Sequence, residues 1–155
     1  MSNLPSFILR PFADTDHAQW QTLWQAYLAY AGTTLSADVS RLTWQRLLTH
    51  PAMHGLGAYD PAGNMLAFAH IILHPNTWNI GECAYLEDLF VSETARKQGI
   101  ARALLNAVYD LAKQQHCNRV YWVTAADNHQ AQALYRQLAR DSGVIQFRHD
   151  LPASS

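Results

Sequence analysis

The chain has 155 residues, of which 49% are hydrophobic and 15% charged, which is enough apolar material for the core of one globular domain. It contains no apolar run of membrane-spanning length and no basic-then-apolar signal pattern at its N-terminus. Cys83 and Cys117 lack metal-ligand spacing and form no disulfide framework. We therefore expect one domain over residues 1–151, a frayed tail over residues 152–155 and a reduced, cytoplasmic setting.

The formal net charge of −1 argues against a general nucleic-acid binder. The charge is unevenly distributed along the chain. Residues 1–95 hold 3 basic and 8 acidic side chains, which sum to −5, and residues 96–155 hold 8 basic and 4 acidic side chains, which sum to +4. This pattern is either chance scatter or the mark of two ligands of opposite charge, one for each half.

The first half of the chain opens with a short strand candidate at residues 6–12. Residues 14–32 then carry apolar side chains at helical spacing, with Asp14 or Asp16 to cap the start of the helix. A weaker helical pattern covers residues 39–48. A hairpin pattern follows over residues 55–73, with a turn built from proline, glycine and asparagine.

The second half alternates strand and helix patterns, which predicts an α/β fold around a mixed sheet. The apolar run at residues 119–124 is typical of a strand that is buried on both faces. The predicted segments are a loop at 74–82, a strand at 83–91, a helix at 100–114, a strand at 119–124, a helix at 128–143 closed by Gly143, and a last strand at 144–151.

A basic turn lies before the predicted helix at residues 100–114. The first amides of a helix are unpaired and favour anions, so a pyrophosphate fits there. Gly99 lets the backbone approach a phosphate, and Arg96 and Lys97 supply positive charge. The turn is neither a Walker loop nor a dinucleotide fingerprint, and by itself it is also compatible with an ordinary helix start.

The motif "RKQGIA" resembles the pyrophosphate-binding turn R/Q-x-x-G-x-G/A of the GNAT (GCN5-related) N-acetyltransferase superfamily. Downstream, "YWVTAADNHQAQALYRQLA" resembles that family's second motif, and "YLEDLFV" is closest to its spermidine/spermine acetyltransferase-like and Hpa2-like branch. The resemblance implies a single GNAT fold, a largely antiparallel sheet of about six to seven strands with about four helices. It also implies acetyl-CoA as cofactor and a homodimer. The implied cofactor contacts are Leu89, Phe90, Val91, Arg96, Lys97, Gln98, Gly99, Ile100, Ala101, Arg102, Asn128 and Tyr135.

Two carboxylates, Glu87 and Asp88, interrupt an apolar strand pattern. An ammonium must lose a proton before its nitrogen attacks a thioester, and a carboxylate with a raised pKa can accept that proton. In an extended strand the two side chains point to opposite faces, so one of them can face an acceptor. From the resemblance we assign Glu87 as the base. We leave Asp88 as an ammonium contact or a structural acceptor; a purely structural role for both is the alternative.

Tyr135 lies at the position of the family's general acid, which protonates the departing thiolate, although its place on an apolar helix face also suits a core tyrosine. Backbone amides after Asp88 can donate to the thioester carbonyl if a strand bulge turns one toward it. Asn128 can cap the following helix, contact the cofactor, or do both.

The resemblance also implies that the first two helices line the acceptor site, and on the first of them Tyr27 and Tyr30 offer aromatic faces to a cation. His74 is a candidate loop residue near the acceptor. His70 and His74 would share one strand face, but we expect no metal site because no third ligand is evident.

Together these features predict direct acetyl transfer from acetyl-CoA to a primary amine, with a small cationic amine such as a polyamine or an amino-acid-like acceptor as substrate. Acetylation of a protein lysine or N-terminus is one alternative, and a non-catalytic acyl-CoA-binding regulatory module is another. No membrane or nucleic-acid partner is expected. No cysteine lies at a nucleophile position, so no acetyl-enzyme is expected.

Overall fold

In the part of the chain that the structure describes, five strands form one sheet, and their order in space follows their order in the chain. The computed structural model describes residues 6–153. The first four strands are antiparallel to their neighbours, and the last pairs in parallel with the fourth. The elements are β1 (Ile8–Pro11), α1 (His17–Tyr30), α2 (Ala37–Thr49), β2 (Met53–Tyr59), β3 (Met65–His74), β4 (Cys83–Val91), α3 (Ile100–Gln114), β5 (Arg119–Tyr121) and α4 (His129–Leu138), with short 3₁₀ turns at Asp14–Asp16 and Glu93–Ala95.

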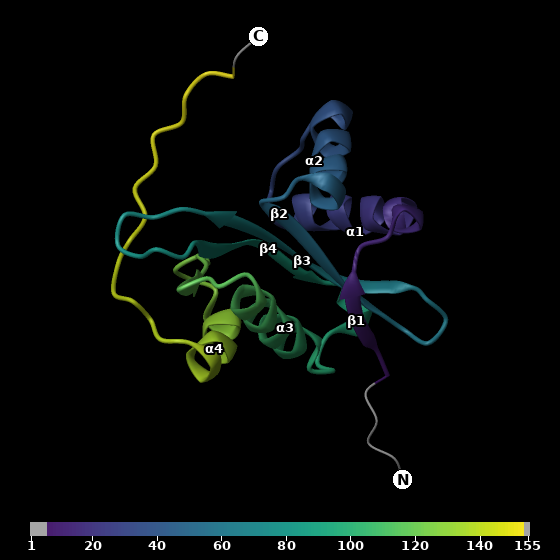
Figure 1. The fold of residues 1–155 in the computed structure, drawn as a ribbon. Helices are drawn as coiled ribbons and strands as arrows, with labels where there is room; N and C mark the ends of the chain where they lie inside the picture. Colours follow the sequence, from purple (N-terminus) through teal and green to yellow (C-terminus); the bar gives the residue numbers. More distant parts are fainter. Residues whose placement is uncertain (1–5, 154–155) are drawn as a thin grey trace. The chain divides into compact units, whose positions relative to one another are not determined.

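Helices α1 and α2 cover one face of this sheet and α3 covers the other (Figure 1). The core on the α1 and α2 side is aromatic, with Trp20, Trp24 and Trp44 packed on Phe68 and Phe90. On the opposite face, one stripe of α3 is buried, as its apolar periodicity predicts. Helices therefore cover both faces at the centre of the sheet.

A β-bulge interrupts β4 where its two carboxylates lie. His70 of β3 pairs with Asp88, but the next residue of β3, Ile71, pairs with Leu86, so Glu87 has no partner of its own. An extra residue of this kind reorients the side chains around it. The strand pattern alone does not reveal the bulge.

Most predicted elements of the first unit, residues 1–123, are confirmed. The hairpin turn closes through the Asp60 amide on the Asn64 carbonyl at 2.9 Å, with Gly63 at φ 88°. The start of α1 differs from expectation, because the Asp16 side chain does not cap it. The Asp16 carboxylate instead accepts hydrogen bonds from Arg10, Tyr59 and the Ala13 amide.

The predicted strand at residues 119–124 is wrong in length and in burial. β5 covers three residues, of which Arg119 is exposed and the other two are half-buried. An apolar run indicates a buried strand only where both faces are covered, and here the strand ends before the run does.

The second unit, residues 124–155, contains α4 and a long segment without helix or strand. Asn128 caps α4 as predicted, because its Oδ1 accepts from the Ala131 amide at 3.3 Å. The helix ends at Leu138, before Gly143. The predicted strand at 144–151 is wrong, since these residues pair with no strand of the described chain. Alternation of side chains defines a strand face, but a strand also needs a backbone partner.

Over the described residues, the sheet therefore has five strands rather than six or seven, while the mixed, largely antiparallel class and the four α-helices agree with expectation. Within residues 6–153, no helix is long and apolar enough to cross a bilayer.

Candidate active site

A cavity of about 330 Å³ lies within the first unit and contains both carboxylates of β4. Aromatic and apolar side chains make up most of its wall, and the polar groups are few, which is typical of a site for a small molecule. Its lining residues are Trp24, Tyr27, Leu28, Ala31, Thr33, Leu35, Thr43, Leu47, Met53, His70, Ile72, Glu87 and Asp88.

Both Glu87 and Asp88 line this cavity, which corrects the expectation that they point to opposite faces. The reason is the bulge at Glu87, where the alternation of β4 is broken. The two side chains also differ in exposure. Glu87 is exposed, whereas the Asp88 side chain is 13% exposed. The bulge thus brings together two negative groups in different surroundings.

The pKa of Glu87 is raised above its ordinary value. The largest cause is the loss of hydration caused by surrounding protein atoms, and the negative charge of Asp88 adds to it, while a hydrogen bond with Tyr85 acts in the opposite direction. A carboxylate with a raised pKa is a better proton acceptor than an ordinary one. This property suits the predicted role of Glu87.

Asp88 is held by two side chains from other elements. The Tyr27 hydroxyl of α1 donates to Oδ1 at 2.6 Å, and Nδ1 of His70 on β3 lies 2.9 Å from Oδ2. Burial, with Asp88 beside the hydroxyl, raises the pKa of Tyr27 well above its ordinary value. Tyr27 therefore lines the cavity as predicted, with its hydroxyl committed to Asp88.

The other two predicted acceptor residues are not among those that line the cavity. Tyr30 is 68% exposed, with its ring centroid 6.3 Å from that of Phe90. Nε2 of His74 lies 2.7 Å from the Tyr121 hydroxyl. Their acceptor roles stay predictions. Within residues 6–153, no three His, Cys, Asp or Glu side chains are grouped as metal ligands would be.

The predicted phosphate-binding turn has an unusual backbone. Lys97 and Gly99 both have positive φ, 64° and 79°, and Gly99 is the N-cap of α3. A Cβ placed on Gly99 would meet no atom within 4 Å, so the space above this backbone is open. The first amides of α3 have no partner within the helix, and unpaired amides at a helix start favour an anion. The turn therefore fits a pyrophosphate.

Other side chains of the turn have partners within the protein. Nε of Arg96 donates to the Val91 carbonyl at 3.3 Å, and Oε1 of Gln98 accepts from the Ser6 hydroxyl at 3.3 Å. Ile100 is buried under α3. The backbone amides and Lys97 are thus the groups best suited to meet a phosphate.

One edge of β4 is open along its second half. In the described chain β5 pairs only with Cys83–Tyr85, so residues 86–91 have β3 on one side and no strand on the other. Unpaired backbone amides and carbonyls can bind an extended ligand as an added strand would. Leu89, Phe90 and Val91 lie on this edge, which leads into the predicted phosphate-binding turn. An acyl-pantetheine arm ending in a diphosphate fits this succession of groups.

Asn128 and Tyr135 both belong to the second unit. Asn128 caps α4, and Tyr135 is half-buried on that helix. The proposed part of each in binding or protonation stays a prediction.

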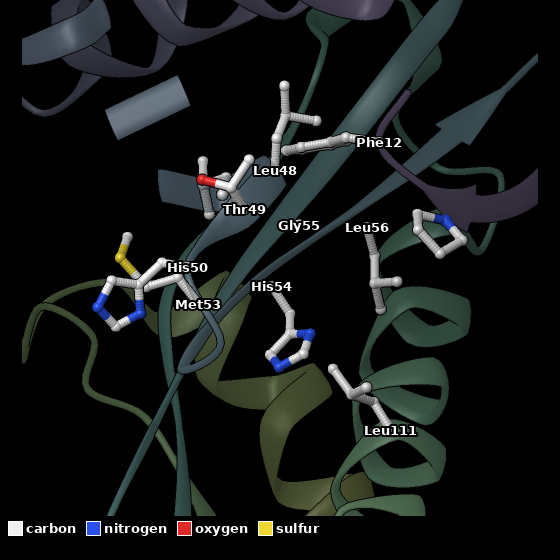
Figure 2. Close-up of a pocket in the computed structure, with 11 residues that line it drawn as sticks. Phe12, Leu48, Thr49, His50, Met53, His54, Gly55, Leu56 and Leu111 are labelled. Carbon is white, nitrogen blue, oxygen red and sulfur yellow. The ribbon is translucent and has the colours of Figure 1, made fainter. Parts of the chain in front are cut away.

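A second cavity, of about 220 Å³, lies beside β2 and contains no carboxylate (Figure 2). The imidazole of His54 points from β2 toward Leu111 of α3, and its Nε2 has no hydrogen-bond partner in the described part of the chain. His50, Met53 and apolar side chains complete the wall. With no anionic group, this cavity is a poorer place for a cation than the first.

Sequence reasoning missed several lining residues, among them Thr33, Leu35 and Thr43. They come from the α1–α2 connection and from α2, and no local pattern indicates that they face β4. From the sequence alone, His70 is considered only as a potential metal ligand. A lone histidine within the apolar run of β3 was the available signal, because a buried imidazole needs polar partners.

Comparison with known proteins gives one consistent result. The sequence model of the acetyltransferase (GNAT) family matches residues 17–139. A D-amino-acid N-acetyltransferase of Saccharomyces cerevisiae is 30% identical over 145 residues, covering 92% of this chain and 90% of its own. A thialysine N-epsilon-acetyltransferase of Caenorhabditis elegans is 30% identical over 66% of each chain. The structure of an aminoglycoside N-acetyltransferase in complex with CoA superposes with a TM-score of 0.80 at 18% identity, covering 93% of this chain and 94% of its own.

Proposed function

The chain belongs to the acetyltransferase (GNAT) family and is an acetyl-CoA-dependent N-acetyltransferase, and from that premise we propose that its acceptor is the primary amine of a small cation. A polyamine or an amino-acid-like amine has this chemistry. The supporting observation is the cavity of about 330 Å³ that contains two carboxylates and two aromatic rings. Two of the similar proteins are named for acceptors that are amino acids.

In the proposed reaction, Glu87 accepts a proton from the acceptor ammonium, directly or through one water, and so frees the nitrogen lone pair. Asp88 holds the ammonium beside it. Acetyl-CoA, when bound, supplies an activated acetyl thioester. The amides of the open β4 edge donate to its carbonyl oxygen as the nitrogen–carbon bond forms and the carbon–sulfur bond breaks. Tyr135 then donates its proton to the leaving thiolate, and the second proton, which the nitrogen loses as the amide forms, returns to Tyr135 through solvent.

A protein lysine or N-terminus remains the alternative acceptor, and a non-catalytic acyl-CoA-binding module is the other alternative. The volume of the cavity favours a small amine over a folded protein surface. The raised pKa of Glu87 favours a catalyst over a binding module.

The test is release of free CoA thiol from acetyl-CoA in the presence of an acceptor panel. The panel contains polyamines, D- and L-amino acids, thialysine, aminoglycosides and lysine peptides. We expect release with at least one small cationic amine, and we expect the neutral alcohol of the same shape to give none. Release with lysine peptides alone would establish the first alternative. A thermal shift by CoA with no release for any acceptor would establish the second.

We also propose a homodimer that works in the cytoplasm. Both cysteines are free thiols, as a reducing compartment would keep them. The tail of the second unit exposes four large apolar side chains, which suits an interface with a second copy.

A further inference from the structure

We infer that His70 is a positioning residue that orients Asp88 as the ammonium-binding carboxylate, and that Trp20 fixes the tautomer of His70 for this purpose. The inference rests on the proposed function, because it concerns how the acceptor cavity selects a cation. Three elements supply the groups: Trp20 comes from α1, His70 from β3 and Asp88 from β4.

The proton positions on His70 follow from its two partners. The indole N–H of Trp20 lies 3.0 Å from Nε2 of His70, and an indole nitrogen can only donate. Nε2 must therefore be the unprotonated nitrogen, which leaves the proton on Nδ1. That nitrogen lies 2.9 Å from Oδ2 of Asp88, where an ionised carboxylate can only accept. If both nitrogens carried a proton, Nε2–H of His70 and the indole N–H of Trp20 would be two donors facing each other without an acceptor.

The surroundings of His70 are closely packed. The ring is 2% exposed and stacks on Phe68 with centroids 4.4 Å apart. Trp20 is wholly buried in the aromatic core. A carboxylate held by such a ring has little freedom to rotate, and preorganisation of this kind lowers the cost of binding a ligand.

Asp88 keeps capacity for a ligand after both contacts are made. Tyr27 donates to Oδ1 and His70 to Oδ2, so each oxygen accepts one internal hydrogen bond and retains a further acceptor site. The side chain also lines the cavity. An ammonium is the ligand that suits these sites, because it brings both donors and the opposite charge.

A purely structural role for the network makes a different prediction. In that case, removing the two nitrogens of His70 would destabilise the protein and would not weaken the binding of charged ligands more than that of neutral ones. The chain offers a matched control in Tyr59, whose hydroxyl donates to Oδ2 of Asp16 at 2.8 Å in a second buried network. Neither Tyr59 nor Asp16 lines the acceptor cavity.

The experiment measures binding of butylammonium and of its neutral isostere butan-1-ol by NMR titration, without acetyl-CoA. His70→Phe keeps the stacked ring and removes both nitrogens. We expect butylammonium to bind about tenfold more weakly in this variant, as for a lost hydrogen bond to a charged group, with butanol binding unchanged. His70→Asn, whose amide can take the place of Nδ1–H, should recover most of the affinity. Tyr59→Phe should bind both probes as the wild type does.

Kinetics and spectroscopy provide readouts that a structural role would not move. With an accepted amine, His70→Phe should raise the acceptor KM by about tenfold and leave kcat within about twofold. Nitrogen-15 spectra of the wild type should show His70 as the Nδ1–H tautomer at pH 7, a measurement that requires no variant to fold.

The inference is overturned by an Nε2–H tautomer or an imidazolium in the wild type. Equal loss of butylammonium and butanol binding in His70→Phe, or no recovery in His70→Asn, also overturns it. The proposed function fails separately, if no amine in the panel releases CoA thiol while the titrations still show the dependence on His70.

Discussion

Glu87 and Asp88 are adjacent in the chain, but their surroundings suit them to different chemical roles. Asp88 has fixed donors on both oxygens, so it is suited to hold a charge in place. Glu87 is exposed at the bulge and has a raised pKa, so it is suited to exchange a proton. The raised pKa of Glu87 depends in part on the charge of Asp88, which couples the two residues.

We predict that Glu87→Gln lowers kcat/KM about tenfold or more near neutral pH, because it removes the base. The deficit should shrink at high pH, where the amine loses its proton without help. The wild type should also lose activity as pH falls through the raised pKa of Glu87, and the variant should lack that limb. A pH–rate profile of both proteins provides the measurement, and Glu93→Gln, outside the cavity, is the control. Equal profiles would contradict the assignment.

The raised pKa of Glu87 also affects stability: a rise in pH increases activity but decreases the stability of the fold. Since Glu87 binds its proton more tightly in the folded chain than in the unfolded one, the unfolded state holds fewer protons and stability falls as pH rises through the folded pKa. Above that pH the ionised side chain destabilises the fold. Glu87→Gln should therefore keep or raise the melting temperature at pH 7, with loss of activity and no loss of stability.

At the scale of elements, the junction from β4 to α3 joins the two surfaces that we propose for the cofactor in a short stretch of chain. β4 contributes an open edge, and the turn that follows contributes positive φ at Lys97 and Gly99 before α3 begins. A residue with a Cβ at Gly99 would place atoms in open space where the ligand is expected. The positive φ and the proposed phosphate contact therefore both favour glycine at position 99.

We predict that Gly99→Glu raises the KM for acetyl-CoA about tenfold or more, because the carboxylate would enter the phosphate space and repel the anion. Gly63→Glu is the matched control, since Gly63 also has positive φ, 88°, with no atom within 4 Å of an added Cβ. Both variants should lose similar stability, of order 1 kcal/mol for a left-handed non-glycine residue. Steady-state kinetics and thermal melts separate the two effects. An unchanged KM in folded Gly99→Glu would contradict the phosphate assignment.

At the scale of the whole molecule, the second unit is unusual for the apolar surface of its tail. Val144, Ile145, Phe147 and Leu151 are each at least 78% exposed. A chain of this size seldom leaves such residues in contact with water without a partner. Their pattern predicted a strand, and a strand requires a backbone neighbour that this segment does not have in the described chain.

We predict that sedimentation velocity gives a mass twice the 17.5 kDa of one chain. The double substitution Ile145→Asp and Phe147→Asp should shift the protein toward the monomer, because it places charges in the proposed interface. Ile80→Asp is the control, since Ile80 is also a fully exposed apolar residue but lies in the loop after β3. A 17.5 kDa species for the wild type across micromolar concentrations would contradict the dimer.

The sequence by itself determined the local elements and the chemical inventory. Apolar spacing located α1, α2 and α3, and glycine with asparagine located the hairpin turn, because these features depend on neighbours in the chain. Likewise the "RKQGIA" turn was recognisable because the residues that form it are contiguous.

Only the tertiary structure decided how the site is assembled. The bulge at Glu87 depends on the register between β3 and β4, and the Trp20–His70–Asp88 network joins residues up to 68 positions apart. No local pattern encodes such pairings. The length of β5 and the fate of residues 144–151 were missed for the same reason: burial and strand pairing depend on what lies across the sheet, and the sequence of one segment does not contain its partner.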